Sequence, residues 1–513
     1  MGHSSTPITI TDPARVSVYT WTCSTFAAVG SLLYGVDSGI VSTTISQPSF
    51  LEYFAPFPAS IKGTVVSIFN VGALLGVLFA GWSADYFGRK RTIQYASLFA
   101  LLAGIIQASA INIPMLLVGR ILGGFCAGIM NMTVPIYHCE VAPPAKRGMI
   151  AGLHGQFVGV GFAIANWVGF GCSYASGAFQ WRFPLAFQCL PALIVLFGAS
   201  WLPFSPRWLI ERRRDDEAMA VLKRLHGKAG DADSSVQDEF KNIRDQIHLE
   251  NSIKLGFKEM FMKPSYRKRL LLAVLIQVFT QLSGINVINY YQTDIYKGLG
   301  ITGHTITLLA SFYGMAGPLA NIICLMFVDR WGRKRTLWIT GLLMAIDASL
   351  VMAMTASFVH NGSPVGKGFA IAFIFCFTMI YSLGYNSIHF IYVPEIMPLN
   401  IRASGSSISL CCNVLVNILF SQVSPIAFAS VGWKYYALFI GTNIVGALVV
   451  FLVFPETKGK SLEEIGVIFG DDITPPTSYP DESKTRSYED QIREKAQRYH
   501  SDGVQIRNEE LHN

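Results

Sequence analysis

Runs of about 20 predominantly apolar residues recur along this 513-residue chain, and they restrict its fold more than any other feature. A run of this length is what an α-helix needs to cross the hydrocarbon core of a bilayer. Charged residues make up only 14% of the chain, against about 25% in soluble domains. We expect twelve spans, near 18–40, 63–83, 93–111, 115–138, 149–172, 183–203, 270–292, 305–328, 337–357, 368–392, 406–430 and 434–454. The predicted fold class is therefore an all-α integral membrane protein.

A charged motif between two apolar runs occurs twice. The sequence Asp85-Tyr-Phe-Gly-Arg-Lys-Arg-Thr92 returns as Asp329-Arg-Trp-Gly-Arg-Lys-Arg-Thr336, 244 positions later. In both copies an acid is followed three residues later by a glycine, and then by a basic triplet and a threonine. A charged hairpin repeated in corresponding places indicates two copies of one membrane unit, as in two-lobed transporters.

Two further charged features repeat in the same order. Glu140 and Arg147 lie seven positions apart, as do Glu395 and Arg402. The stretch Pro203-Phe-Ser-Pro-Arg207 closes the first half, and Pro455-Glu-Thr-Lys-Gly459 closes the second. The repeats predict two pseudo-symmetric six-helix bundles.

The net charge of +7 follows from topology, and no nucleic-acid partner is expected. Lys and Arg cluster at 89–91, 146–147, 207–269 and 333–335, whereas the alternate loops carry about one each, namely Lys62, Arg182, Lys297, Lys367 and Lys434. Loops rich in Lys and Arg face the cytoplasm. An even number of spans then places both termini there as well.

This topology divides the chain into five segments. Residues 1–17 form a cytoplasmic segment, 18–203 the first bundle, and 270–454 the second bundle. Between the bundles, 204–269 mixes charged and apolar residues at helical spacing, which fits either short amphipathic cytoplasmic helices or a solvated linker. The cytoplasmic tail, 455–513, is polar and predicted to be disordered after about 466.

The repeated charges fit a cytoplasmic gate. Ion pairs between the basic motifs and acids at nearby helix ends would hold the cytoplasmic mouth shut and separate when it opens, as a bistable contact must. The predicted gate residues are Asp85, Arg89, Glu140, Arg147, Asp329, Arg333, Glu395, Arg402 and Glu456. The alternative is that the cations only anchor the topology.

The ordered set of motifs resembles the sugar porter family of the major facilitator superfamily over about residues 20–465. The motifs are the two Asp-x-x-Gly-Arg-Lys copies, Glu140…Arg147-Gly148, Gln281-Leu-Ser-Gly-Ile-Asn286, Glu395…Arg402 and Pro455-Glu-Thr-Lys-Gly459. Gln180-Trp-Arg-Phe-Pro-Leu and Gly432-Trp-Lys-Tyr-Tyr resemble fungal hexose and other monosaccharide transporters in particular. The resemblance implies twelve helices around a central site that opens alternately to each side.

Asp37 lies deep in the first span, where a charged residue is costly and marks a functional candidate. Arg120 in the fourth span lies at a similar depth, because the two spans run in opposite directions. The resemblance implies that these helices are neighbours, and that an acid at position 37 can couple sugar transport to protons. If the arginine moves away, the proton affinity of the desolvated carboxylate rises. Some similar hexose facilitators, which are not proton-coupled, also carry an acid at this position. The alternative to proton coupling is that Asp37 and Arg120 form a purely structural ion pair.

Uncharged amides suit sugars, because each amide can both donate and accept hydrogen bonds. Four-residue spacing places Gln277 with Gln281, and Asn286 with Tyr290, on shared helix faces, and Ser283-Gly284 between the pairs predicts a helix break. The resemblance places Gln156, Gln277, Gln281, Asn286, Asn413 and Asn417 where family members hold their sugar. Interhelical hydrogen bonding is the alternative role.

Several positions depart from the family pattern and leave the substrate open. Thr280 stands where many hexose carriers have glutamine, and Gly317 where many have asparagine. Asn386 and His389 occupy the tenth span, where Gly and Pro are usual. Both are further substrate candidates, although His389 also fits a bond to a neighbouring helix. Phe204 stands where a gating glutamate is expected.

The sequence predicts an alternating-access transporter of a monosaccharide, in the first instance a hexose, that works as a proton symporter in the plasma membrane. The alternatives are an uncoupled facilitator of a hexose, pentose, disaccharide or polyol, and a sugar sensor that does not transport. The spans contain no nucleophile–base pair, metal cluster or P-loop, so neither an enzyme nor ATP-driven transport is expected. The expected partners are the sugar, a proton and the lipid bilayer, with no cofactor or metal, and a monomer suffices.

Overall fold

The computed structural model describes residues 17–143, 147–226, 257–358, 364–398 and 401–458, with shorter stretches within 236–247 and 465–470. These residues form helices joined by short turns, and none of them lies in a β-strand. The segment 1–16 lies outside the described residues. So do the residues beyond 470, which make up most of the tail that the sequence predicts to be disordered after about 466. The described part of the chain is therefore all-α, as the sequence predicts.

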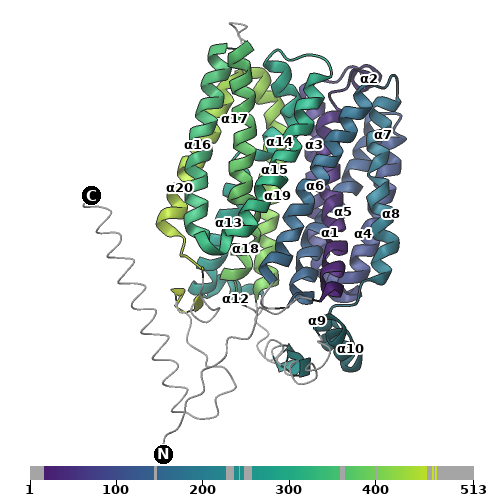
Figure 1. The fold of residues 1–513 in the computed structure, drawn as a ribbon, viewed down its shortest axis with the longest axis vertical. Coiled ribbons are helices and arrows are strands. Elements are labelled where there is room, and N and C mark those ends of the chain that lie inside the picture. Colours follow the sequence, from purple (N-terminus) through teal and green to yellow (C-terminus); the bar gives the residue numbers. More distant parts are fainter. Residues whose placement is uncertain are drawn as a thin grey trace, which may run out of the picture. The chain divides into compact units, whose positions relative to one another are not determined.

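The chain divides into two compact units, one of residues 1–56 and 68–251, the other of 57–67 and 252–513. The first contains, in order, α1 (Val18–Thr44), α2 (Pro48–Tyr53), most of α3 (Ala59–Phe87), α4 (Arg89–Ala108), α5 (Ile113–Val141), α6 (Arg147–Ser173), α7 (Phe179–Phe187), α8 (Cys189–Gly198), α9 (Pro206–Glu211) and α10 (Asp215–His226). These are the purple, blue and dark teal helices of Figure 1.

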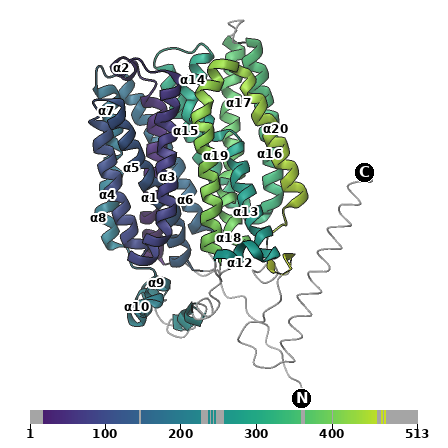
Figure 2. The same ribbon diagram turned by 180° about the vertical axis from the view of Figure 1, so that it is seen from behind.

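The second unit contains α12 (Phe257–Met262), α13 (Pro264–Leu282), α14 (Ile285–Gly298), α15 (Thr305–Trp331), α16 (Arg333–Phe358), α17 (Pro364–Leu383), α18 (Tyr385–Ile396), α19 (Arg402–Val431) and α20 (Tyr436–Val453). In both views, α13 lies beside α19, and α16 beside α20 (Figures 1 and 2). The first residues of α3 also pack in this unit, where the ammonium of Lys62 lies 2.6 Å from a carboxylate oxygen of Asp294 on α14.

Each unit repeats the same helix pairing. In the first, α1 packs on α6, and α4 packs on both α5 and α8. In the second, α13 packs on α19, and α16 packs on both α17 and α20. These helices hold corresponding places in the two halves of the chain, so the sequence repeat is also a repeat of tertiary contacts.

Small residues set the distance between α3 and α5. A Cβ atom at Gly124 or Gly128 of α5 would overlap the backbone carbonyl oxygen of Phe69 or Ala73 on α3. Helices in membranes associate through such close backbone approaches, because burial of apolar side chains gains little from a lipid environment. This contact holds Phe69 close to α5, where it helps to surround Arg120.

The predicted helix break at Ser283-Gly284 is confirmed, since α13 ends at Leu282 and α14 begins at Ile285. Gly284 has φ +91°, a left-handed conformation that glycine adopts readily. A side chain there would also collide with the ring of Phe439. Neighbouring α20 satisfies the backbone at the break, because Asn443 donates to the carbonyl of Ser283 over 3.1 Å.

Among the residues that the structure describes, ten segments are long and apolar enough to cross a membrane. They include α1, α3, α5, α6, α7–α8, α13–α14, α15, α16 and α17–α18, while residues 404–453 count as a single segment although they hold two helices, α19 and α20. Helix α4, which covers the predicted span 93–111, is not among the ten. The protein is therefore a multi-pass membrane protein.

The first part of the connection between the halves, α9 and α10, packs within the first unit. Helices α9 and α10 share a small core in which Trp208, Leu209 and Ala218 are buried. The indole of Trp208 donates to the carbonyl of Asp85 over 2.9 Å, so this core is tied to the first charged motif. His226 at the end of α10 bonds the carbonyl of Val141, the last residue of α5, over 3.0 Å.

Candidate functional site

Asp37 and Arg120 form an ion pair inside the first unit. Asp37 lies on α1 with 5% of its surface exposed, and Arg120 lies on α5 with 1% exposed. The guanidinium also lies over the ring of Phe69, 4.4 Å from its centroid. The aromatic face and the carboxylate together compensate a charge that would otherwise be very costly at this depth.

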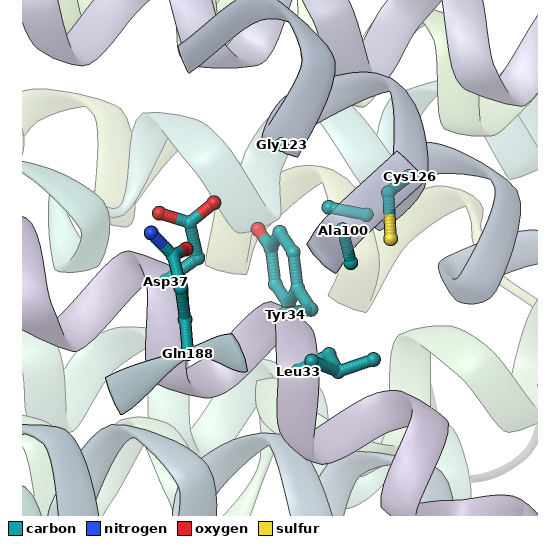
Figure 3. A pocket seen from close by; sticks show the side chains of 8 residues that line it. Leu33, Tyr34, Asp37, Ala100, Gly123, Cys126 and Gln188 are labelled. Carbon is teal, nitrogen blue, oxygen red and sulfur yellow. The ribbon is translucent and has the colours of Figure 1, made fainter. Parts of the chain in front are cut away.

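Asp37 also lines a small pocket within this unit (Figure 3). The pocket walls come from α1, α4, α5 and the junction of α7 with α8, where Gln188 lies. Neither Gln188 nor Gln107, whose amide lies near Gly123 of the same pocket, was singled out in the sequence analysis. The available signal was weak, since it consisted of single amides within otherwise apolar runs.

Four amides of the second unit form a continuous network. The Nε2 of Gln281 donates to Oδ1 of Asn413 over 2.8 Å, and Nδ2 of Asn413 donates to Oε1 of Gln277 over 2.9 Å. Asn286, beyond the helix break, donates to Oε1 of Gln281 over 2.7 Å. Helices α13, α14 and α19 are thus joined by side chains that can also donate to and accept from a ligand.

A second link joins α14 to α19. The amide of Asn417 donates to the hydroxyl of Tyr290 over 3.3 Å. Asn417 is four residues beyond Asn413, and Tyr290 is four beyond Asn286, so this link lies one helical turn from the network. The amide of Asn417 and the phenol of Tyr290 extend the network as a polar strip along adjoining faces of the two helices.

Three other predicted substrate residues lie on helices other than α13, α14 and α19. Gln156 is half-buried on α6 of the first unit, and Asn386 is half-buried on α18. His389 is buried on α18, where Nδ1 lies 2.6 Å from the carbonyl oxygen of Tyr385 one turn earlier. Its recorded hydrogen bond is therefore to its own helix, rather than to the neighbouring helix considered in the sequence analysis.

The first charged motif is held by ion pairs. Arg89, at the start of α4, lies 2.9 Å from a carboxylate oxygen of Glu140 near the end of α5. The same guanidinium lies 3.5 Å from Asp85. Both Arg89 and Glu140 have side chains less than one-tenth exposed, so this pair is better protected from screening than a surface pair.

The second motif repeats this arrangement. Arg333, at the start of α16, lies 2.9 Å from Glu395 on α18, which also accepts from the hydroxyl of Thr457 over 2.7 Å. Arg402 donates to the carbonyl of Met397 over 3.3 Å. The side chains of Arg147 and Asp329 lie outside the described part of the structure.

The two motifs differ in which side chain contacts the start of the helix that carries the basic triplet. In the second unit, Glu456 accepts from the backbone N–H groups of Arg333 and Lys334 over 2.9 and 3.1 Å, which caps α16. In the first unit, the corresponding position holds Phe204, whose ring lies 5.1 Å from the ammonium of Lys90. A cation–π contact therefore replaces the carboxylate cap, and the ends of the two units are held by different chemistry.

Replacing Glu456 with Ala is expected to destabilise the second unit by about 2 kcal/mol, because it removes both a cap and a favourable charge from the start of α16. The thermal midpoint of the purified protein in detergent should fall by several degrees. Glu217→Gln is the matched control, since its exposed pair with Arg214 contributes little. Equal midpoints for the two variants would contradict the capping role.

Comparison with known proteins identifies the family. The profile described as "Sugar (and other) transporter" matches residues 23–469. This chain belongs to the sugar transporter family of the major facilitator superfamily. The family resemblance inferred from the motifs is thus confirmed, and the family consists of membrane transporters rather than enzymes.

The transporter is 36% identical over 475 residues to the MFS-type transporter criB of Aspergillus cristatus, which covers 92% of this chain and 98% of that one. It is 31% identical over 445 residues to the galactose-proton symporter of Escherichia coli, covering 86% and 92% of the two chains. The solved structure of the proton:xylose symporter XylE with 6-bromo-6-deoxy-D-glucose matches with a TM-score of 0.75 at 22% identity, covering 88% and 99% of the chains. That last likeness shows the shared fold.

Proposed function

We propose that this transporter carries a monosaccharide, in the first instance a hexose, across the plasma membrane together with a proton. In this proposal the helices form twelve spans, with α13–α14 and α17–α18 as broken spans, α4 as the third, and α19 and α20 as the last two. Both termini are cytoplasmic. One relative bears the name of a galactose-proton symporter, which supports both the sugar class and the coupled ion.

The buried pair of Asp37 and Arg120 carries the proposal of proton coupling. An ionised carboxylate this deep in the protein depends on its cationic partner. When Arg120 moves away, Asp37 gains affinity for a proton, and when it returns, the proton leaves. A conformational change that separates the two residues therefore links protonation to the direction in which the site opens.

The amide network carries the proposal of a sugar substrate. Gln277, Gln281, Asn286 and Asn413 bind one another through both donor and acceptor atoms. A ring with several hydroxyl groups can exchange these internal bonds for bonds to itself at little net cost, because each hydroxyl also donates and accepts. Tyr290, Asn417, Gln156, Asn386 and His389 are proposed as further contacts that narrow the range of sugars accepted.

Gating is proposed for the paired charges at the two motifs. The Arg89–Glu140 and Arg333–Glu395 pairs each join two helices of one unit. They hold the cytoplasmic ends of those helices in place while the mouth on that side is closed. Rearrangement of the pairs, with Asp85, Arg147, Asp329, Arg402 and Glu456, accompanies opening.

Uptake by vesicles that contain the purified transporter tests this function. Labelled hexoses, pentoses and polyols should be compared with and without a pH gradient that is acidic outside. A symporter of one proton is expected to accumulate its substrate about tenfold per pH unit, since one unit corresponds to about 1.4 kcal/mol. A protonophore should abolish the accumulation.

Two alternatives give different results in the same assay. A facilitator of a hexose, pentose, disaccharide or polyol equilibrates its substrate at every pH gradient and never accumulates it. A sensor binds the sugar but moves none of it. Absence of transport for every sugar tested, in protein shown to be folded, would contradict the proposed function.

A further inference from the structure

A pocket beside Asp37 is lined by polar groups that take no part in the ion pair with Arg120. Its lining combines apolar side chains such as Leu33 and Ala100 with the polar groups of Tyr34, Asp37 and Gln188 (Figure 3). All of them belong to the first unit. Its volume of about 10 Å³ is close to the smallest cavity that holds one water molecule.

The Gln188 amide is buried without a recorded partner for its donor. The side chain is 4% exposed, and Nε2 makes no hydrogen bond within the described part of the chain. Gln188 is also the residue at which α7 passes into α8. A buried amide donor is normally satisfied, by protein or by ordered water, because an unmade bond at such a group is costly.

Glycine keeps the space next to the carboxylate open. A Cβ atom at Gly123 would lie 2.7 Å from Oδ2 of Asp37 and 3.2 Å from Nε2 of Gln107. Gln107 is fully buried, and its Oε1 has no hydrogen-bond partner among the described residues. Two incompletely satisfied amides therefore flank the same carboxylate, and a water molecule needs two to four such polar partners.

We propose that this pocket is a binding site for one water molecule, which accepts a hydrogen bond from Nε2 of Gln188 and donates one to the carboxylate of Asp37. The inference rests on the proposed proton coupling and assigns the step by which the proton arrives. When hydronium passes a proton to this water, the water passes the proton that it already donates on to Asp37, so the products are two neutral water molecules and a neutral carboxylic acid. Gln188 is a positioning residue, because it orients the water and does not itself take the proton.

Other ionisable groups around the pocket do not compete for this role. Arg120 and Cys126 come from α5, and Tyr34 comes from α1. Arginine stays protonated. The thiol and the phenol already carry their protons near neutral pH, because both are far weaker acids than a carboxylic acid. Helix α4 and the start of α8 supply the neutral amides. Asp37 is thus the acceptor for a proton delivered to this pocket.

Gln188→Leu tests the water site in reconstituted vesicles, because leucine has a similar volume and no donor. Loss of the water removes a hydrogen bond that stabilises the ionised carboxylate, so the pH of half-maximal proton-driven uptake should rise by about one unit, a tenfold change in proton affinity. Gln188→Asn retains an amide donor and leaves more room, so its midpoint should move back toward the original value. Gln94→Leu is the matched control, since Gln94 bonds Ser200 at an exposed position.

The outcomes separate this inference from the proposal it rests on. If the unaltered transporter accumulates sugar with the pH gradient but Gln188→Leu keeps the same midpoint, the water site is wrong and coupling stands. If Gln188→Leu and Gln188→Asn shift the pH of half-maximal uptake equally, loss of the amide donor does not cause the shift, which also overturns the inference. If the unaltered transporter ignores the gradient, proton coupling fails and the delivery step fails with it. Binding of labelled sugar shows that each variant is folded.

Discussion

Replacing Asp37 with Asn is expected to abolish accumulation of sugar against its gradient. The amide cannot take up a proton, so transport loses the link between protonation and the opening of the site. With a gradient of one pH unit, the ratio of internal to external sugar should fall from about ten to about one. Exchange of labelled for unlabelled sugar, which needs no net proton movement, should remain measurable.

Stability must be separated from coupling in this experiment. Removal of one partner of a buried ion pair leaves the other charge uncompensated, at a cost of about 3–5 kcal/mol. The double variant Asp37→Asn with Arg120→Gln removes both charges and should restore part of the lost stability. Asp294→Asn, which removes an acid from another ion pair, is the matched control and should still accumulate sugar. Full accumulation by Asp37→Asn would show that another residue couples the proton.

Replacing Gln281 with Ala is expected to raise the KM for sugar about 10- to 100-fold. Gln281 holds the centre of the amide network, since it donates to Asn413 and accepts from Asn286. Its loss removes one contact with the sugar and leaves two other amides misplaced. Together these effects should weaken the free energy of sugar binding by about 1.4–2.8 kcal/mol. Initial rates of zero-gradient uptake over a range of sugar concentrations measure the change.

Asn321→Ala provides the comparison for this variant. Asn321 is also a buried amide of the second unit, but it accepts from the hydroxyl of Ser387, outside the network. Its replacement should affect stability more than KM. If the two variants have the same KM, the network is a structural connection between helices, which is the alternative that the sequence analysis left open.

Much of this protein follows from its sequence, because membrane spans are local properties. Spans of sufficient length, a repeated charged motif and a helix break at Ser283-Gly284 can each be predicted from short stretches of residues. The expected depths of Asp37 and Arg120 could be derived in the same way, from the rise per residue and the direction of each span. Their contact required the further fact that α1 and α5 are neighbours.

What the tertiary structure decided is which polar atoms meet. Gln188 and Gln107 are far apart in the sequence, and nothing local relates either of them to Asp37, yet the folded first unit brings all three near Gly123. Likewise, Glu456 caps α16 while its counterpart Phe204 packs against Lys90. Hydrogen bonds and small cavities form only when segments far apart in the sequence are positioned to within a few tenths of an ångström. Apolar periodicity and charge spacing specify the helices, and the packing of those helices specifies the site.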